Sequence, residues 1–272
     1  MRFVSAIDPA CQGALAALDR RLAAFYNSSQ IAEYFRRASE ANRAWDESGP
    51  HGIVLALAGP GKHVLEMGCG SAVGYEHLRA LGIEYTGVDW SAEQIARNAE
   101  RFPEARFICT TLYETGLADG MFDVVFSTYV LEHLVWPHRA LREMARLVKP
   151  GGVIVVICPH YRRAGRCPSL PFGGPGSFRE KLAAGCYGQA VLHFFYRFWW
   201  PLVVGMRREP FLINLRPRCF VEPNRPDNDA VYLPERGECL RLLGALGFAD
   251  ITGEFSVRIP REVCVIAARR VV

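Results

Sequence analysis

The sequence predicts an α/β fold in which a mostly parallel sheet is covered by helices on both faces. From residue 63 onward, short apolar runs alternate with segments spaced like amphipathic helices, which is the pattern that a doubly covered parallel sheet requires. A glycine-rich turn follows the first apolar run, at residues 68–74, and leads into a helical segment. Towards residue 270, two more apolar runs follow a helical segment near 235–246. These three observations predict one decorated α/β domain.

The expected elements follow one another in a regular order. Strands are expected at residues 64–67, 85–88, 106–109, 122–126 and 153–158, with helices near 74–81, 91–101 and 137–147. Ser91 and Gln94 form a capping box at the start of the second helix, and Pro137 opens the third. Residues 149–152, Lys-Pro-Gly-Gly, are expected to form a sharp break in regular structure before the fifth strand. A helix near 235–246 and strands near 248–255 and 263–268 complete the pattern.

Two regions flank or interrupt this pattern. Residues 10–26 and 29–47 have helical spacing, and Gly49-Pro50 is expected to end the second helix. Between residues 159 and 234 the alternation is lost, and this stretch holds 13 of the 31 aromatic residues. We therefore expect a helical cap (1–50), a central domain (51–158 with 235–272) and an insert (159–234) that acts as an acceptor-binding lid.

Composition excludes several classes of protein. The net charge of +4 is too small to indicate a nucleic-acid binder. Nine scattered cysteines without a C-x-x-C pair argue against zinc ribbons and disulfide scaffolds, and favour a reducing cytoplasm. Asp8 and Pro9 interrupt any apolar run near the start, so no secretory signal is expected. No stretch reaches the ~18 to 20 apolar residues of a membrane-spanning helix.

The segment VLEMGCGSAVG, residues 64–74, is expected to bind a nucleoside. Its glycines are spaced G-x-G-x-x-x-G, one residue longer than the dinucleotide fingerprint, which argues against a nicotinamide enzyme. Gly68 and Gly70 allow the backbone to approach a ligand that a Cβ atom would keep away. Asp89 ends the next apolar run, where a carboxylate accepts hydrogen bonds from both hydroxyls of a ribose.

Together with three later segments, this motif resembles the class I S-adenosylmethionine-dependent methyltransferases, in the group that methylates small molecules. The other segments are GVDWS, FDVVFSTYVLEHL (122–134) and LVKPGGVIVV (147–156), and the resemblance spans about residues 55–158. It implies S-adenosylmethionine as the cofactor. It also implies a seven-stranded, mostly parallel sheet with an antiparallel last strand.

Position by position, the resemblance implies cofactor contacts. These are Glu66 with the ammonium group, Gly68, Cys69 and Gly70 with the methionine part, Asp89 with the ribose, Trp90 with the adenine, and Ser127, Thr128 and Tyr129 with the sulfonium. Many relatives carry an aspartate for the adenine amino group where this chain has Thr110 or Thr111, and the backbone near Leu112 would help there. Simpler accounts are that Glu66 caps a turn, that Asp89 caps the next helix, and that Trp90 and Cys69 only pack.

Methyl transfer needs alignment of an acceptor lone pair with the methyl group and exclusion of water. For a hydroxyl acceptor, His133 is the first candidate for the general base, followed by Tyr129 and His160. Alternatively, His133 only packs against the cofactor. Some relatives bind a metal through Glu-x-x-Glu-His, but Tyr129 replaces the first glutamate here. Glu132 and His133 alone are too few ligands for a catalytic metal, so no metal is expected.

The insert is expected to select the acceptor. Residues 191–206 are nearly all apolar, and three roles remain open for them: an acceptor pocket, a membrane-surface contact or a dimer interface. His193 and Arg197 share a helix face, which suits an acceptor with an apolar body and a polar or anionic end. The expected activity is methyl transfer to a small molecule, at oxygen in preference to nitrogen or carbon, by a monomer or homodimer. The alternatives are a non-catalytic interaction module and a membrane-surface methyltransferase acting on a lipid-linked glycan or quinol.

Overall fold

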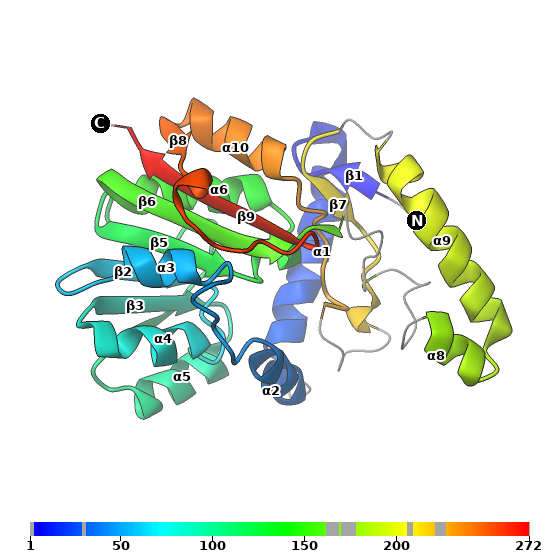
Figure 1. Cartoon of the computed structure of the whole chain (residues 1–272), viewed down its shortest axis with the longest axis horizontal. Coiled ribbons are helices and arrows are strands. Elements are labelled where there is room, and N and C mark those ends of the chain that lie inside the picture. Colours follow the sequence, from blue (N-terminus) through cyan, green and yellow to red (C-terminus); the bar gives the residue numbers. More distant parts are fainter. Residues whose placement is uncertain are drawn as a thin grey trace.

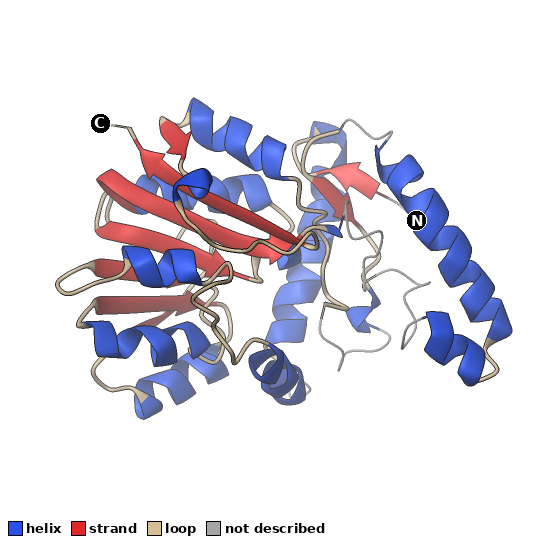
Figure 2. Cartoon of the chain, in the orientation of Figure 1, coloured by secondary structure: helices blue, strands red, loops and turns tan. Residues whose placement is uncertain are grey.

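A seven-stranded sheet forms the centre of the molecule (Figures 1 and 2). The computed structural model describes residues 3–28, 31–161, 169, 178–205, 209–220 and 227–271. In spatial order the strands are β4 (Arg106–Cys109), β3 (Glu84–Asp89), β2 (His63–Met67), β5 (Phe122–Thr128), β6 (Val148–Pro159), β9 (Val263–Arg270) and β8 (Phe248–Asp250). The first five are parallel, whereas β9 is antiparallel to both β6 and β8. The predicted α/β sheet with an antiparallel last strand is therefore confirmed.

Helices cover both faces of this sheet because successive side chains of each strand point to opposite sides. On one face, α3 (Gly52–Leu57) and α4 (Val73–Leu78) pack against Val124 and Phe126. On the other face, α1 (Gln12–Tyr26), α6 (Pro137–Leu147) and α10 (Arg236–Ala245) share a core with Val125. The helix α5 (Ala92–Arg101) follows β3, and Ser91 caps it by accepting a hydrogen bond from the Gln94 amide, as the capping box predicts.

The N-terminal helices differ in part from the prediction. The expected helix at 10–26 forms as α1, which buries the stripe of Leu15, Leu18, Leu22 and Phe25. The second helix, α2 (Ile31–Ala41), ends six residues before the expected position. Residues 42–51 fold back instead, and a Cβ at Gly52 would lie only 1.9 Å from the Glu47 carbonyl oxygen. This close approach leads into α3, a helix that was not predicted.

The cap and the insert are joined by a small sheet that was not predicted. Strand β1 (Phe3–Ser5) pairs antiparallel with β7 (Leu212–Asn214), so residues of the expected cap and of the expected insert lie side by side. Three-residue strands carry too little pattern to be recognised in a sequence. The predicted domain boundaries stay a prediction, but these two parts share backbone hydrogen bonds.

The helices α8 (Phe178–Ala183) and α9 (Tyr187–Gly205) lie at the end of the molecule opposite β8, beyond β1 and β7 (Figure 1). Within the described part of the chain, no helix is long and apolar enough to cross a bilayer. The loop-like segment expected from residue 159 onward lies largely outside the described residues.

Two strand boundaries were wrong. Residues 149–152 do not break the regular structure before the strand but belong to β6, which begins at Val148 opposite Phe122. The pairing register shifts between Phe122 and Val124, and a positive φ of 75° at Gly151 accommodates the irregularity. The expected strand at 248–255 ends as β8 at Asp250, because the Asp250 carboxylate accepts a hydrogen bond from the Thr252 amide and a 3-10 turn begins there.

Candidate functional site

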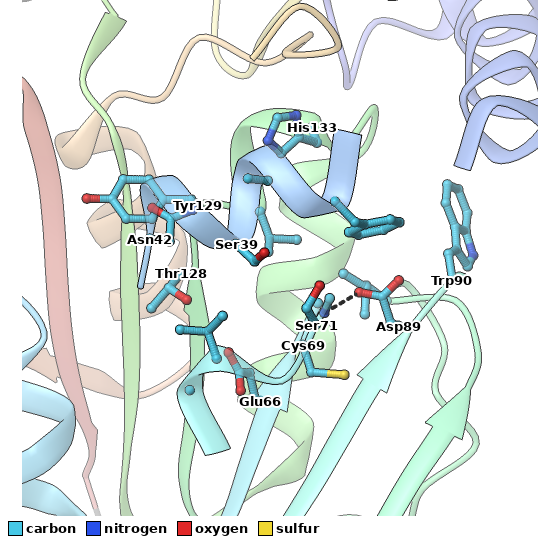
Figure 3. Close-up of a pocket in the computed structure, with 18 of the residues that line it drawn as sticks. Ser39, Asn42, Glu66, Cys69, Ser71, Asp89, Trp90, Thr128, Tyr129 and His133 are labelled. Carbon is cyan, nitrogen blue, oxygen red and sulfur yellow. Dashed lines mark hydrogen bonds between the residues drawn. The ribbon is translucent and has the colours of Figure 1, made fainter. Parts of the chain in front are cut away.

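A cavity opens at the carboxyl ends of β2, β3 and β5, where ligands bind in open α/β sheets (Figure 3). The space it encloses, including the part open to solvent at its mouth, is about 1030 Å³. The helix α2 crosses the cavity on the side away from the sheet (Figure 3), and its side chains, Phe35 and Ser39 among them, line the cavity.

The glycine-rich turn between β2 and α4 forms one wall. The amides of Gly68 and Cys69 both donate to the Val88 carbonyl oxygen, at 2.8 and 3.0 Å, which holds the turn against β3. Gly68 has a φ of +82°, and a Cβ there would lie 2.5 Å from a methyl carbon of Val130. Only glycine fits this position without movement of its surroundings. The turn therefore exposes its backbone to the cavity, as the sequence predicted.

Asp89 lies at the end of β3 and lines the cavity. One carboxylate oxygen accepts a hydrogen bond from the Gly70 amide at 2.8 Å, and the other accepts one from the Ser91 amide at 2.9 Å. Burial raises the pKa of Asp89, and these two amide hydrogen bonds oppose that shift. Because each carboxylate oxygen has two lone pairs, the group can still accept ligand hydroxyls. Ser91 rather than Asp89 caps α5, so the simpler account of Asp89 as a helix cap is wrong.

Glu66 lies at the floor of the cavity and is only 3% exposed (Figure 3). The Tyr85 hydroxyl donates a hydrogen bond to its carboxylate. A Cβ at Gly74 would lie 2.4 Å from the same carboxylate, so the third glycine of the motif makes room for this side chain. Burial raises the pKa of Glu66 to about 8. A ligand ammonium group would supply a positive charge beside this carboxylate.

Several other predicted contacts also line the cavity. They are Cys69, Gly70, Trp90, Leu112, Thr128 and Tyr129. Trp90 packs edge-to-face against Tyr113, with 6.0 Å between ring centroids. Burial raises the pKa of the Cys69 thiol far above its usual value, which excludes a thiolate nucleophile.

Four predicted site residues do not line the cavity. The Thr110 hydroxyl donates to the Thr115 carbonyl oxygen, and the Thr111 hydroxyl accepts a hydrogen bond from the Tyr113 amide. Ser127 is buried beside Thr128, and strand alternation turns its side chain to the other face of the sheet. His160 follows the end of β6 and lies buried outside the cavity. The structure thus places these four side chains outside the cavity wall, and their roles stay predictions.

The opposite end of the cavity from Glu66 is formed around His133, in a short 3-10 turn after β5 (Figure 3). The His133 Nδ1 atom lies 3.0 Å from the carboxylate of Asp229, a fully buried residue near the end of the insert. The hydroxyl of Tyr34 donates to this carboxylate at 2.9 Å, and the hydroxyl of Tyr26 also donates to it. Asp229 therefore joins both N-terminal helices to the turn that carries His133.

This arrangement argues against His133 as the general base. Burial lowers its pKa, but the carboxylates of Asp229 and Glu132 outweigh burial and raise it to about 10. An imidazole that is already protonated at neutral pH cannot accept a proton. Burial also raises the pKa of Tyr129, so its phenol stays neutral.

The cap residues that line the cavity, and the insert residue Asp229 that contacts His133, were not predicted. Tyr26, Tyr34, Phe35 and Asn42 come from the helical cap. The only sequence signal was an aromatic, helically spaced stripe, and such stripes usually form part of the core. Asp229 had no signal, because it lies 96 residues after His133 and is brought there only by folding.

With this geometry established, comparison with known proteins identifies the domain. Residues 65–156 match the family described as a methyltransferase domain. A malonyl-[acyl-carrier protein] O-methyltransferase from Pectobacterium atrosepticum is 32% identical over 133 residues, which cover 47% of this chain and 53% of the relative. A ubiquinone biosynthesis O-methyltransferase from Maricaulis maris is 34% identical over 121 residues, covering 42% and 46%. The matches thus span about half the length of these relatives.

Solved structures share the fold. The 1,6-didemethyltoxoflavin-N1-methyltransferase of Burkholderia thailandensis, solved with bound 1,6-didemethyltoxoflavin and S-adenosylhomocysteine, aligns with a TM-score of 0.53. The alignment covers 93% of this chain and 91% of that protein at 17% sequence identity, so it shows a common fold. The family match, the strand order and the glycine turn agree with one another. The chain therefore contains a class I S-adenosylmethionine-dependent methyltransferase domain.

Proposed function

We propose that this protein transfers the methyl group of S-adenosylmethionine to an oxygen atom of a small-molecule acceptor. The observation that carries the proposal is the pair of carboxylates on either side of the glycine turn. Asp89 offers lone pairs suited to ribose hydroxyls, and Glu66 is a buried acid suited to the ammonium group. The residues present thus fit the cofactor at both of its polar ends.

The remaining residues of the cavity would position the acceptor. When bound, S-adenosylmethionine supplies an electrophilic methyl group on a sulfonium. Thr128 ends β5 and Tyr129 directly follows it, and both line the cavity between its Glu66 and His133 ends. The neutral Tyr129 phenol can donate a hydrogen bond that orients an acceptor oxygen. The covering helix α2 would exclude water, which favours in-line transfer.

Methylation at oxygen is supported by the character of the acceptor end. Hydroxyl and imidazole groups, rather than carboxylates alone, surround the space near His133. The relatives from Pectobacterium and Maricaulis are both named O-methyltransferases. An oxygen that is already ionised needs no general base, which suits a site whose histidine is protonated.

Calorimetry tests the cofactor site. Wild-type protein should bind S-adenosylmethionine and S-adenosylhomocysteine, and Asp89→Ala should weaken both by at least about 100-fold, because two hydrogen bonds to a charged group are lost. Glu84→Ala is the matched control, since Glu84 begins the same strand at the end far from the cavity. Mass spectrometry of candidate acceptors would then show the gain of a methyl group. Absence of binding to either nucleoside by folded wild-type protein would contradict the proposal.

A second candidate, methyl transfer at a membrane surface, is favoured by one face of α9. Tyr187, Val191, Phe195 and Trp199 follow one another at intervals of four residues, and each is more than half exposed. A row of exposed apolar side chains at this spacing suits an amphipathic helix that lies on lipid. Flotation with lipid vesicles tests it: Phe195→Ser should reduce binding, whereas Ile259→Ser, at an exposed apolar site elsewhere, should not. Wild-type protein that stays at the bottom of the gradient would eliminate this candidate.

A further inference from the structure

Helix α1 places a carboxylate among the apolar side chains of its buried face. Asp19 lies four residues after Leu15 and three before Leu22, and both of these leucines are buried in the core. Asp19 itself is half-buried, and burial raises its pKa to about 6, while a hydrogen bond from Tyr113 and the charge of Arg139 oppose the shift. Near pH 7 the carboxyl group is therefore mostly ionised, and the proposed methyl transfer gives it no role.

The Tyr113 hydroxyl connects this carboxylate to the rest of the molecule. It donates a hydrogen bond to Asp19 Oδ1 at 3.0 Å and accepts one from the Val135 amide at 3.1 Å. Asp19 belongs to the helical cap, whereas Val135 precedes α6 and Tyr113 follows β4. Because two partners from separate elements hold the hydroxyl, the ring cannot swing away without losing these hydrogen bonds.

The Tyr113 ring also forms part of the cavity wall. It lines the cavity together with Trp90, Leu112 and Leu134. Trp90 directly follows Asp89, the carboxylate suited to the ribose, and stands beside it in the cavity (Figure 3). A base attached to that ribose would therefore meet the Trp90 and Tyr113 rings, and aromatic rings are favourable surfaces for a base.

Helix α6 and the turn before it support the same ring from another direction. The Arg139 guanidinium carbon lies 5.6 Å from the Tyr113 ring centroid and 5.3 Å from that of Trp136. Trp136 in turn packs edge-to-face against Tyr113, with 5.4 Å between ring centroids. The sheet domain thus holds one side of this aromatic wall, and Asp19 adds the support from the cap.

We propose that Asp19 is a positioning residue for the cofactor: it holds the Tyr113 hydroxyl and thereby fixes the aromatic wall against which the base of S-adenosylmethionine lies. The inference rests on the proposed cofactor site and adds to it a residue of the cap. Asp19 does not line the cavity, so it acts through Tyr113. A wall that is fixed before the cofactor arrives needs less ordering on binding, which favours affinity. Cofactor binding should in turn stabilise α1, because coupling between two sites is reciprocal.

Calorimetry with S-adenosylhomocysteine on the full chain tests this positioning role. Asp19→Ala and Tyr113→Phe should each weaken binding by about 5- to 10-fold, because each removes the hydrogen bond between the two side chains. The double variant should lose no more affinity than Tyr113→Phe alone, since the two side chains act as one unit. Asp19→Asn keeps an oxygen that accepts the hydroxyl and should restore most of the affinity. In wild-type protein, S-adenosylhomocysteine should also slow hydrogen exchange of the α1 amides, and Asp19→Ala should reduce this protection.

A matched control separates this role from general support of the helix. Leu18→Ala removes a buried side chain from α1, so it should lower the melting temperature at least as much as Asp19→Ala, yet leave S-adenosylhomocysteine affinity within about twofold of wild type. Equal affinity in wild type and Asp19→Ala, or losses that add up in the double variant, would overturn the inference while the proposed cofactor site stands. A loss of affinity in Leu18→Ala as large as in Asp19→Ala would overturn it as well. Wild-type protein that binds no S-adenosylhomocysteine would count against the proposed function itself, and against this inference with it.

Discussion

Cofactor binding should release a proton from Glu66. This glutamate is buried at the floor of the cavity, and desolvation raises its pKa to about 8, although the hydrogen bond from Tyr85 opposes the shift. Near neutral pH the free protein therefore holds Glu66 mostly protonated. A cofactor ammonium group beside it favours the carboxylate, so binding lowers the pKa again.

The size of the effect follows from the pKa. At pH 7, a carboxyl group with a pKa of about 8 is roughly 90% protonated, so binding should release about 0.9 proton. The association constant should then rise about ninefold between pH 6 and pH 7, because the unbound state carries the extra proton. In this range the cofactor's own amino group, with a reference pKa of ~7.7 to 8.0, stays largely charged.

Calorimetry in buffers of different ionisation enthalpy measures the released protons. Glu66→Gln keeps the shape of the side chain but cannot ionise, so it should abolish both proton release and the pH dependence. Glu104→Gln is the matched control: Glu104 also accepts a hydrogen bond from a tyrosine, Tyr75, but it is exposed and outside the cavity. An unchanged association constant between pH 6 and pH 7 in wild-type protein would refute the reasoning.

Two further predictions concern stability, measured by urea unfolding. Gly68→Ala should lower the free energy of unfolding by more than the ~1 to 2 kcal/mol that a left-handed backbone costs, because the new Cβ collides with Val130. Gly61→Ala has open space around its Cβ and should show the backbone cost alone. Equal losses of stability in the two variants would contradict this prediction. Asp229→Asn should lower the free energy of unfolding by about 3 to 5 kcal/mol, since it breaks a buried pair with His133. Asp119→Asn, in an exposed pair, should cost less than about 1 kcal/mol, and a similar loss for both variants would count against the buried pair.

Much of the cofactor side of the cavity was predictable because it is local in the chain. The glycine turn directly follows β2, and Asp89 directly ends β3, so strand periodicity and parallel pairing place both at one sheet edge. Thr128 and Tyr129 follow by the same rule at the end of β5. The prediction for Ser127 differed in side-chain direction, because this side chain points to the face of β5 away from the cavity.

The acceptor side was not predictable in this way. Tyr34 lies in a helix that read as part of the core, and Asp229 lies in a segment without periodicity. Their meeting at His133 depends on the pairing of β1 with β7 and on the hydrogen bonds from residues 231–232 to the Glu132 carbonyl oxygen. Contacts between residues so far apart in the chain leave no local pattern.

The amino-acid sequence alone determined the sheet, its glycine turn and the carboxylate that ends the second strand, because hydrophobic period and backbone freedom are properties of neighbouring residues. Only the tertiary structure decided the environment of His133. The charge of an imidazole depends on which carboxylates lie within a few ångströms of it and on how far water is excluded. Both are set when the cap and the insert close over the carboxyl ends of the strands.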